Sequence, residues 1–428
     1  MSDQNSEFWL ALHAACGGSA AAGEFLRQQP NIAKLFEAEA PEELSSVAAA
    51  QLRRTQGFLP NARNALQTCR SEGWAVITPE SDRYPPAFRA LTDPPLAVFA
   101  AGDTSLLQAQ KTAAVVGTRK PATQSVIAAY RLGQALSEYG VVTVSGGALG
   151  IDSAAHEGAL SGPGTTIAVL GNGLGHGYLA EKKFMRRRIQ ARGLLITEQF
   201  PYTGPTYATF PRRNRLIAAL GQSLTVIESA EKGGSMISAS YARSYGCKLF
   251  VLSGRVFFSP GCESLIPKGA VPVADAAEVL KFYGVKNVSV PLENEGAPLP
   301  KVLDPAACTL AEFAALNGAS PEEARPLYER LVSGARQAPV PSPRQASPVP
   351  AVTPLEQAAN KAKKADEKGL TGDTRAVFFA LEDAPVGLDD LAALTGLTPP
   401  RVMTAVTLLE LEGLAQTLPG DRAQLINN

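Results

Sequence analysis

The chain has 428 residues, equal numbers of basic and acidic side chains (40 each) and 45% hydrophobic residues. This composition is typical of a globular protein of two to four domains and excludes collagen-like, coiled-coil and wholly disordered chains. No run approaches 18 apolar residues, and no basic segment precedes the first short apolar run, so we expect a cytoplasmic protein without membrane insertion.

The first part of the chain, residues 1–75, consists of short helical segments interrupted by Gly17-Gly18, Pro30 and Pro41. Glycine and proline punctuate helices in this way, so we expect a small helical domain here.

Residues 76–285 repeat a short β-branched run, a glycine-rich turn and a helical segment. Near-continuous apolar strands separated by helices predict an α/β domain with a doubly wound, mostly parallel sheet covered on both faces. The candidate strands are Thr112–Val116, Val141–Ser145, Thr165–Leu170, Leu194–Glu198, Ser223–Glu228 and Lys248–Ser253, and the shorter runs Trp74–Thr78 and Leu96–Ala100 extend the same sheet.

The last third of the chain contains two similar helix-turn-helix patterns. The segment from Leu388 forms, with its flanks, a winged-helix pattern within residues 370–428. The segment from Leu310 aligns with it at an offset of 78 residues, which predicts a degenerate second unit within 286–335 unless the match is fortuitous. Residues 336–369 between them, rich in Pro and Ala, are predicted to be a flexible linker.

The neutral total charge hides a segregation along the chain. Residues 111–281 carry 19 Lys and Arg against 10 Asp and Glu, whereas residues 370–428 carry three Arg against eight acids. A helix that docks on DNA needs cations for the phosphates, and the expected recognition helix offers only Arg401. We therefore interpret the winged helix as a module that contacts another protein or the chain itself, or equally as a folded appendage without a partner.

Two groups of cations stand out in the α/β region. The first follows one candidate helix from Lys182 to Arg192 and is explained as well by a solvated helix face as by a binding surface. The second, in PTYATFPRRNRLIAAL, places Phe210, Arg212, Arg213 and Arg215 at the predicted start of a helix. Backbone amides, guanidinium groups and an aromatic face together suit a phosphate backbone with an unstacked base.

Three glycine-rich turns follow predicted strands, where α/β sheets bind their ligands. They begin at Gly117, Ser145 and Lys232, and each can present backbone donors to a phosphate. Neither G-x-G-x-x-G nor a P-loop motif occurs, so no nucleotide cofactor is expected and the pattern favours a polymeric phosphate ligand.

The sequence offers little for catalysis or metal binding. His156 shares a predicted helical face with Asp152, but a core or capping histidine explains it better than a base, and no nucleophile is paired with it. The five cysteines are scattered without CxxC spacing, so neither a zinc site nor a disulfide framework is expected. We therefore expect a binding protein and not an enzyme.

An ordered set of motifs now resembles the DprA/Smf family of DNA-processing proteins. The set comprises YPPAFRALTDPP, VVGTR, VSGGALGID, TTIAVLGNGL, FPRRNRLIAAL, VIESAEKGGSMISASYA and GCESLIPKGA, and it covers about residues 80–275. The resemblance implies an extended Rossmann domain with an N-terminal helical domain of the SAM or helix-hairpin-helix kind and a C-terminal winged helix of the DML1 kind.

The resemblance also implies a homodimer that binds and protects single-stranded DNA and loads a RecA-type recombinase during natural transformation in competent cells, with a single-strand-binding protein as a further partner. Carried over by motif, Arg119 resembles the family's phosphate-contacting arginine. The implied DNA-binding residues are Gly117, Thr118, Arg119, Lys120, Ser145, Gly146, Gly147, Phe210, Arg212, Asn214, Arg215, Gly233, Gly234 and Ser235.

The sequence departs from the family's pattern at a few positions and leaves two rival functions open. Tyr207 occupies a place where a lysine is often seen, and Glu263 replaces an asparagine. The first rival is a nucleotide-processing hydrolase of the lysine-decarboxylase-like group, although Ser238 stands where its catalytic acid is expected. The second is a regulator that binds duplex DNA through the winged helix, against which the acidic balance argues.

Overall fold

The computed structural model divides the chain into two compact units, residues 1–337 and 338–428, which are described separately. The structure describes residues 5–16, 32, 55, 57–177, 183–206, 209–254, 257, 259–293, 298–303 and 308–337 of the first unit, and residues 372–381, 386–395, 397, 399–411, 414–418 and 422–425 of the second. The first two residues of the predicted linker, Arg336 and Gln337, are helical, and its other residues lie outside the described ones. The predicted domain limits stay predictions.

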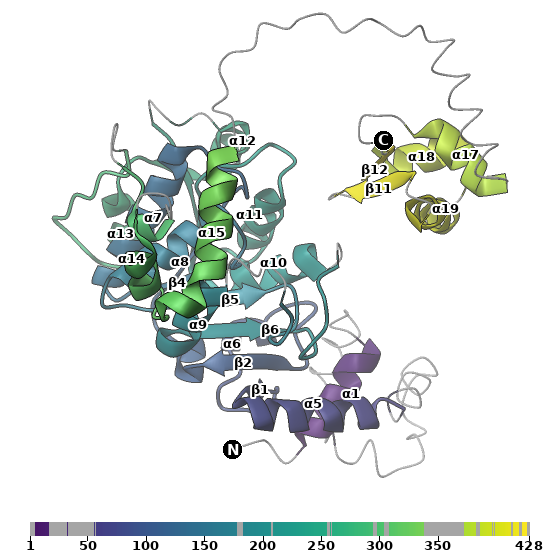
Figure 1. Ribbon diagram of the computed structural model, residues 1–428, viewed down its shortest axis with the longest axis horizontal. Helices are drawn as coiled ribbons and strands as arrows, with labels where there is room; N and C mark the ends of the chain where they lie inside the picture. The colour runs from purple at the N-terminus through teal and green to yellow at the C-terminus, as the bar shows by residue number, and fades with distance from the viewer. Residues whose placement is uncertain are drawn as a thin grey trace, which may run out of the picture. The chain divides into compact units, whose positions relative to one another are not determined.

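Nine strands in the described part of the first unit form one sheet in the order β1-β2-β6-β5-β4-β3-β7-β8-β9. Figure 1 labels the first five strands of this order, from β1 at the edge to β4. The strands from β6 to β9 in this order are parallel, and β1 and β2 add an antiparallel edge. Their bounds are β1 Ala75–Ile77, β2 Val98–Gly102, β3 Thr112–Val116, β4 Val142–Ser145, β5 Thr166–Leu170, β6 Leu194–Thr197, β7 Ser223–Val226, β8 Lys248–Leu252 and β9 Val271–Val273.

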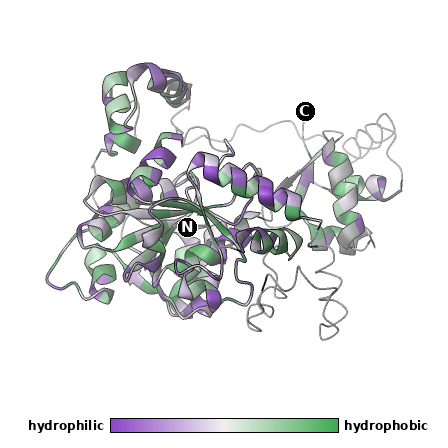
Figure 2. Ribbon diagram, turned by 90° about the horizontal axis from the view of Figure 1, so that it is seen from below, coloured by the Kyte–Doolittle hydropathy of each residue, from purple (hydrophilic) through white to green (hydrophobic). Residues whose placement is uncertain are grey.

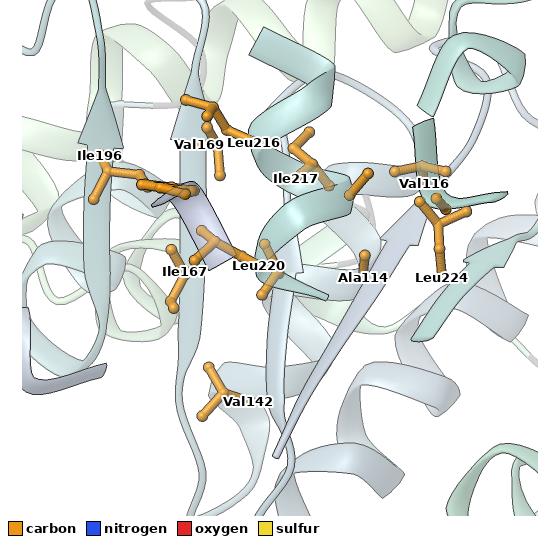
Figure 3. Packing of buried hydrophobic residues seen from close by; sticks show 14 of the residues in the cluster. Ala114, Val116, Val142, Ile167, Val169, Ile196, Leu216, Ile217, Leu220 and Leu224 are labelled. Atoms are coloured by element: carbon orange, nitrogen blue, oxygen red, sulfur yellow. The ribbon is translucent and has the colours of Figure 1, made fainter. Parts of the chain in front are cut away.

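Helices cover both faces of this sheet because successive strand residues point to opposite faces and nearly all are apolar. In β3, Ala114 and Val116 join the core beneath one helical layer, whereas Ala113 and Val115 join the core beneath the other. Figure 2 shows hydrophobic colour along the strands and two-coloured helices around them. In Figure 3, Leu216, Ile217 and Leu220 of one helix lie over the strand side chains.

The helices of the first unit follow the strands in the expected alternation. One layer contains α6 Pro86–Arg89, α10 Thr209–Leu220, α11 Gly234–Ser244 and α12 Pro260–Leu265, and the other contains α7 Thr123–Glu138, α8 Ile151–Ser161 and α13 Ala276–Phe282. Helix α9 Lys183–Arg192 packs on β5 and β6, and short 3₁₀ turns lie at η1 Thr104–Gln108, η3 Ile266–Lys268 and η4 Lys301–Leu303.

The order of the strands creates a topological switch point. The chain runs outward from β3 through β4 and β5 to β6 and then returns to place β7 on the other side of β3. Loops at the carboxyl ends of strands diverge at such a point and leave a crevice for a ligand. The loops after β3 and β7 therefore flank the expected binding position.

Two pairs of helices flank the sheet. At the β1–β2 end, α1 Ser6–Cys16 and α5 Leu59–Glu72 pack on Ala97 and Phe99. After the sheet, α14 Leu310–Leu316 and α15 Pro321–Gln337 form a helical pair, and Phe313 of α14 packs on Phe184 of α9. Both helices of this second pair lie where the degenerate helix-turn-helix pattern predicted helices.

The second unit is a winged helix. Helices α17 Gly372–Ala380, α18 Leu388–Thr395 and α19 Pro399–Leu411 enclose a small core, and β10 Val386–Gly387, β11 Ala415–Leu418 and β12 Arg422–Leu425 form an antiparallel sheet in the order β10-β12-β11. Arg401 of α19 makes a bidentate pair with Asp373 of α17 at 2.7 and 2.8 Å. The cation available on the expected recognition helix is thus already paired.

The predicted strands are confirmed within one or two residues at each end, and both shorter runs do extend the sheet. The sequence analysis missed β9, whose three residues include Pro272. A proline within so short a run masks the strand signal, because proline is confined to edge strands and bulges.

Candidate nucleic-acid interface

The glycine-rich loops predicted from the sequence converge at the carboxyl ends of the strands. Thr118 of the loop after β3 donates its backbone N–H to the carbonyl oxygen of Glu228 after β7 (2.8 Å), and its own carbonyl accepts from the N–H of Ile151 at the start of α8 (3.2 Å). A Cβ atom at Gly117 would lie 2.6 Å from Ile151 Cγ1, so glycine is needed for this close approach. We call the loops 117–120, 145–150 and 228–235, with the start of α10, the carboxyl rim.

Arg119 and Lys120 project from the carboxyl rim into solvent. Both side chains are exposed, and no carboxylate in the described part of the chain lies within ion-pair distance of either. The guanidinium carbon of Arg119 lies 4.7 Å from the ring centroid of Phe210, so the arginine stacks on the aromatic ring. This contact holds the cation in place and leaves its hydrogen-bond donors for a phosphate.

Helix α10 distributes the side chains of FPRRNR over three directions. Thr206 caps its first turn by accepting the backbone N–H of Thr209 (3.3 Å), and the helix then turns 100° per residue. Phe210 and Asn214 consequently share one face, and the Asn214 amide donates to the carbonyl of Gly234 in the carboxyl rim (3.2 Å). Arg213 points to the strand ends, where it is buried and donates to the carbonyl oxygens of Gly146 and Val169.

Arg215 differs most from its expected exposure among the predicted site residues. Its side chain is fully buried, with ion pairs to Glu198 (2.6 Å) and Asp93 (2.8 Å), so the structure presents no exposed guanidinium for the DNA contact predicted for it. Burial alone would raise the pKa of Glu198, but the ion pair with Arg215 outweighs it and lowers that pKa. The arginine holds α10 to the end of β6 instead of facing a ligand.

Arg212 stays near the surface on the same side of α10 as Arg215. Its side chain is one-third exposed, and its nearest carboxylate contact is Glu198 at 4.0 Å. Arg212 is therefore the arginine of FPRRNR that can still meet a phosphate.

Polar groups of the loop after β4 form hydrogen bonds within the protein. Asp152 Oδ2 accepts the backbone N–H of Gly146 (3.1 Å) and of Ala148 (3.4 Å), and the Ser145 hydroxyl donates to the carbonyl of Val115. Burial raises the pKa of Asp152, although Arg213 and these amides favour its ionised form. Ser145, Gly146 and Gly147 are buried, so they support the carboxyl rim from within and present little surface for the direct contact predicted for them.

The loop after β7 divides into a buried and an exposed part. The Ser235 hydroxyl donates to Ser229 Oγ (2.7 Å) and the residue is buried, so the direct contact predicted for Ser235 is also not available. Gly233 and Gly234 remain accessible at the start of α11, where the helix dipole favours an anion.

The cations of α9 are engaged within the protein. Arg188 pairs with Glu157 (2.5 Å), Arg187 and Lys183 pair with Glu323 of α15, and Arg192 donates to backbone carbonyls. Arg186 donates to Asn172 Oδ1 (3.2 Å). These contacts favour a structural explanation of the α9 cluster over a binding surface.

The residues considered for catalysis lie in the interior. His156 is fully buried and its Nδ1 contacts Thr166 Oγ1 at 2.8 Å, as expected for a core histidine. Ser238, where the hydrolase pattern needs an acid, is buried in α11. Within the described ranges, no group of three potential metal-ligating side chains occurs, and no helix is long and apolar enough to cross a membrane.

The sequence analysis missed Asp93 and Glu198, the acidic partners of Arg215. Both lie outside the FPRRNR motif, and single acids carry no periodic signal. Of the positions that depart from the family's pattern, Tyr207 lies outside the described residues and Glu263 is exposed on α12.

The fold and the carboxyl rim define an extended Rossmann-type α/β protein with an appended winged helix. The profile of the family described as DNA recombination-mediator protein A matches residues 75–284, and that of the DprA winged helix domain matches residues 361–421.

Individual relatives agree with these matches. DNA processing protein DprA of Bacillus subtilis is 32% identical over 243 residues, which cover 56% of this chain and 82% of the relative. The crystal structure of DNA processing protein A from Streptococcus pneumoniae is 30% identical with a TM-score of 0.54, covering 66% of this chain and 98% of that one. A structure of DNA processing protein A from Helicobacter pylori, described for its single-stranded DNA binding mode, is 33% identical with a TM-score of 0.45. This match covers 49% of this chain and 95% of that one. This chain belongs to the DprA/Smf family of DNA-processing proteins.

Proposed function

We propose that the protein binds single-stranded DNA along the carboxyl rim with little sequence preference. The observation that carries this proposal is the exposed pair Arg119 and Lys120 at the topological switch point, with Arg119 stacked on Phe210. The cations can contact phosphates, while the guanidinium plane and nearby aromatic rings offer surfaces for unpaired bases. Arg212, Asn214, Gly233 and Gly234 complete the proposed contact surface.

A salt-titrated binding comparison of single-stranded and duplex oligonucleotides tests this function. With Arg119, Lys120 and Arg212 on phosphates, the logarithm of the binding constant should fall with the logarithm of the salt concentration with a slope of about −2. Single strands should bind more tightly than duplexes because stacking needs unpaired bases. Equal affinity for single strands and duplexes, or an affinity that does not change with the salt concentration, would contradict the proposal.

We further propose that the chain acts as a cytoplasmic homodimer, protecting incoming DNA and loading a RecA-type recombinase on it in natural transformation and recombination, without catalysing a reaction itself. Membership of the DprA/Smf family supports this part. The test is recombinase filament formation on DNA covered by a single-strand-binding protein, followed with and without the protein. Filaments that form at the same rate in both cases would refute the loading role.

A further inference from the structure

A cavity lies between the N-terminal helices and the end of β6, and it meets the carboxyl rim at Arg212. It is open to solvent and has a volume of about 600 Å³. Helix α1 contributes His13, helix α5 contributes Asn61, Asn64 and Thr68, and the segment 198–203 contributes Phe200 and Tyr202. Arg212 lines it as well. We call this cavity the α5 groove.

Two buried polar atoms of the residues that line the α5 groove have no hydrogen-bond partner in the described structure. His13 is 4% exposed, and its Nε2 lies 2.7 Å from the carbonyl oxygen of Glu198. A carbonyl only accepts, so Nε2 is the donor; burial lowers the pKa of His13 and keeps it neutral, which leaves Nδ1 as an acceptor. The second atom is Nε of Arg212, which is a donor.

A ligand that reaches these two atoms from the α5 groove satisfies them by offering a donor to His13 Nδ1 and an acceptor to Arg212 Nε. The edge of a nucleobase does so, because each base carries N–H groups beside carbonyl oxygens or ring nitrogens. The amide side chains of Asn61 and Asn64 extend this donor and acceptor surface, since amides pair with base edges. Tyr202 is 59% exposed and provides a ring on which a base can stack.

The loop after β5 brings the α5 groove within reach of a strand bound at the carboxyl rim. A Cβ atom at Gly171 would lie 2.9 Å from Cδ1 of Phe210, and one at Gly175 would overlap the ring of Tyr202. The two aromatic rings thus rest on glycines four residues apart, which an extended chain separates by at most about 14 Å. A few nucleotides of single strand bridge this distance.

We propose that the α5 groove binds an unstacked base of the same single strand that the carboxyl rim holds by its phosphates. This inference rests on the proposed function. It assigns the N-terminal helices a direct part in DNA binding, with Arg212 shared between the two sites, and it predicts a binding site longer than the rim alone.

Photo-crosslinking with an oligonucleotide whose bases are all 5-iodouracil tests the proposal in the full chain. Because every base is reactive, the result does not depend on the register of the strand. We expect mapped adducts on Phe210 in the carboxyl rim and on Tyr202 or Phe200 in the α5 groove. Tyr202→Ala should remove the groove adduct at position 202 and weaken binding about tenfold, the loss of one stacked base.

Tyr139→Ala is the matched control, since Tyr139 is an exposed tyrosine after α7, at the amino end of the strands. This control should bind and crosslink as the wild type does. His13→Phe, whose ring has no hydrogen-bond acceptor, should also weaken binding, and its thermal unfolding shows whether it is folded.

The outcomes separate the groove from the proposed function. Adducts on Phe210 alone, together with an unchanged affinity of Tyr202→Ala, would overturn the α5 groove and leave strand binding at the carboxyl rim intact. A wild-type protein that binds no single strand would overturn both.

Discussion

Helix α9 and the loop after β3 both looked basic in the sequence, and the structure uses their cations in opposite ways. On α9, Arg187 and Arg188 meet carboxylates of α15 and α8. After β3, Arg119 meets an aromatic ring, and no described carboxylate lies within ion-pair distance of it. Cations without a nearby carboxylate are therefore a stronger indication of a phosphate-binding surface than a large number of cations in one segment.

The same contrast recurs within helix α10. Arg213 donates to backbone carbonyls and Arg215 pairs with carboxylates, and both are buried, whereas Arg212, three residues before Arg215, keeps one-third of its side chain exposed. Neighbouring arginines of one motif thus differ in exposure and in their partners.

The largest expected effect comes from removing a structural arginine. Arg215→Ala leaves Glu198 charged and buried without its partner, so the free energy of unfolding should fall by about 3–5 kcal/mol. Urea denaturation of the two proteins measures this loss. The double variant Arg215→Met with Glu198→Gln should recover much of it, and an Arg215→Ala protein as stable as the wild type would mean that Arg215 is not a structural residue.

Removing an arginine of the carboxyl rim should lower the affinity for DNA and leave the stability of the protein unchanged. Arg119→Ala should weaken single-strand binding about tenfold and reduce the salt slope by about 0.7, the share of one phosphate contact, while leaving the urea midpoint unchanged. Arg119→Lys should restore the slope but not the full affinity, because an ammonium group cannot stack as a guanidinium does. A loss of stability on Arg119→Ala would contradict its assignment as a binding residue.

Acid should weaken the N-terminal helices before it affects the other buried pairs. The pKa of His13 is lowered in the folded protein by burial, so its contribution to stability is complete above the unfolded value of 6.5 and is lost as the pH falls below it. The lowered pKa of Glu198 acts in a more acidic range, below its ordinary value of 4.5. Urea midpoints at several pH values measure both ranges, and in His13→Gln the change just below pH 6.5 should disappear.

The smallest effect is expected on α9. Arg187 and Glu323 are both substantially exposed, and a surface pair of this kind contributes about 0–1 kcal/mol. Arg187→Ala should therefore leave both the urea midpoint and the affinity for single strands close to wild type. A drop in affinity as large as that of Arg119→Ala would indicate that α9 contacts DNA as well.

The sheet could be predicted from the sequence because buried parallel strands such as Thr112–Val116 are continuous apolar runs between glycine turns. The place of the site followed from the same pattern, since Gly117, Ser145 and Lys232 all come directly after strands. The switch point between β3 and β7 needed the strand order, which no local signal contains.

Which of the predicted site residues are buried and which are exposed could not be predicted from the sequence. Arg212 and Arg215 belong to one motif, and only the distant acids Asp93 and Glu198 decide which of the two is buried. Likewise, the amides after β4 were expected to face a phosphate, but Asp152, six residues after Gly146, occupies them. Such pairings depend on tertiary contacts between single residues.

Pro272 limits the contacts that the edge strand β9 can make with another chain. In β9 the carbonyl of Val273 accepts the N–H of Ser253 (3.0 Å), so the backbone groups of Val273 face inward and those of Pro272 face outward. Proline has no N–H to give at that border. A neighbouring chain cannot continue the hydrogen-bonded ladder past β9, which protects the protein from edge-to-edge aggregation there and obliges any second copy that docks on this side to use side chains.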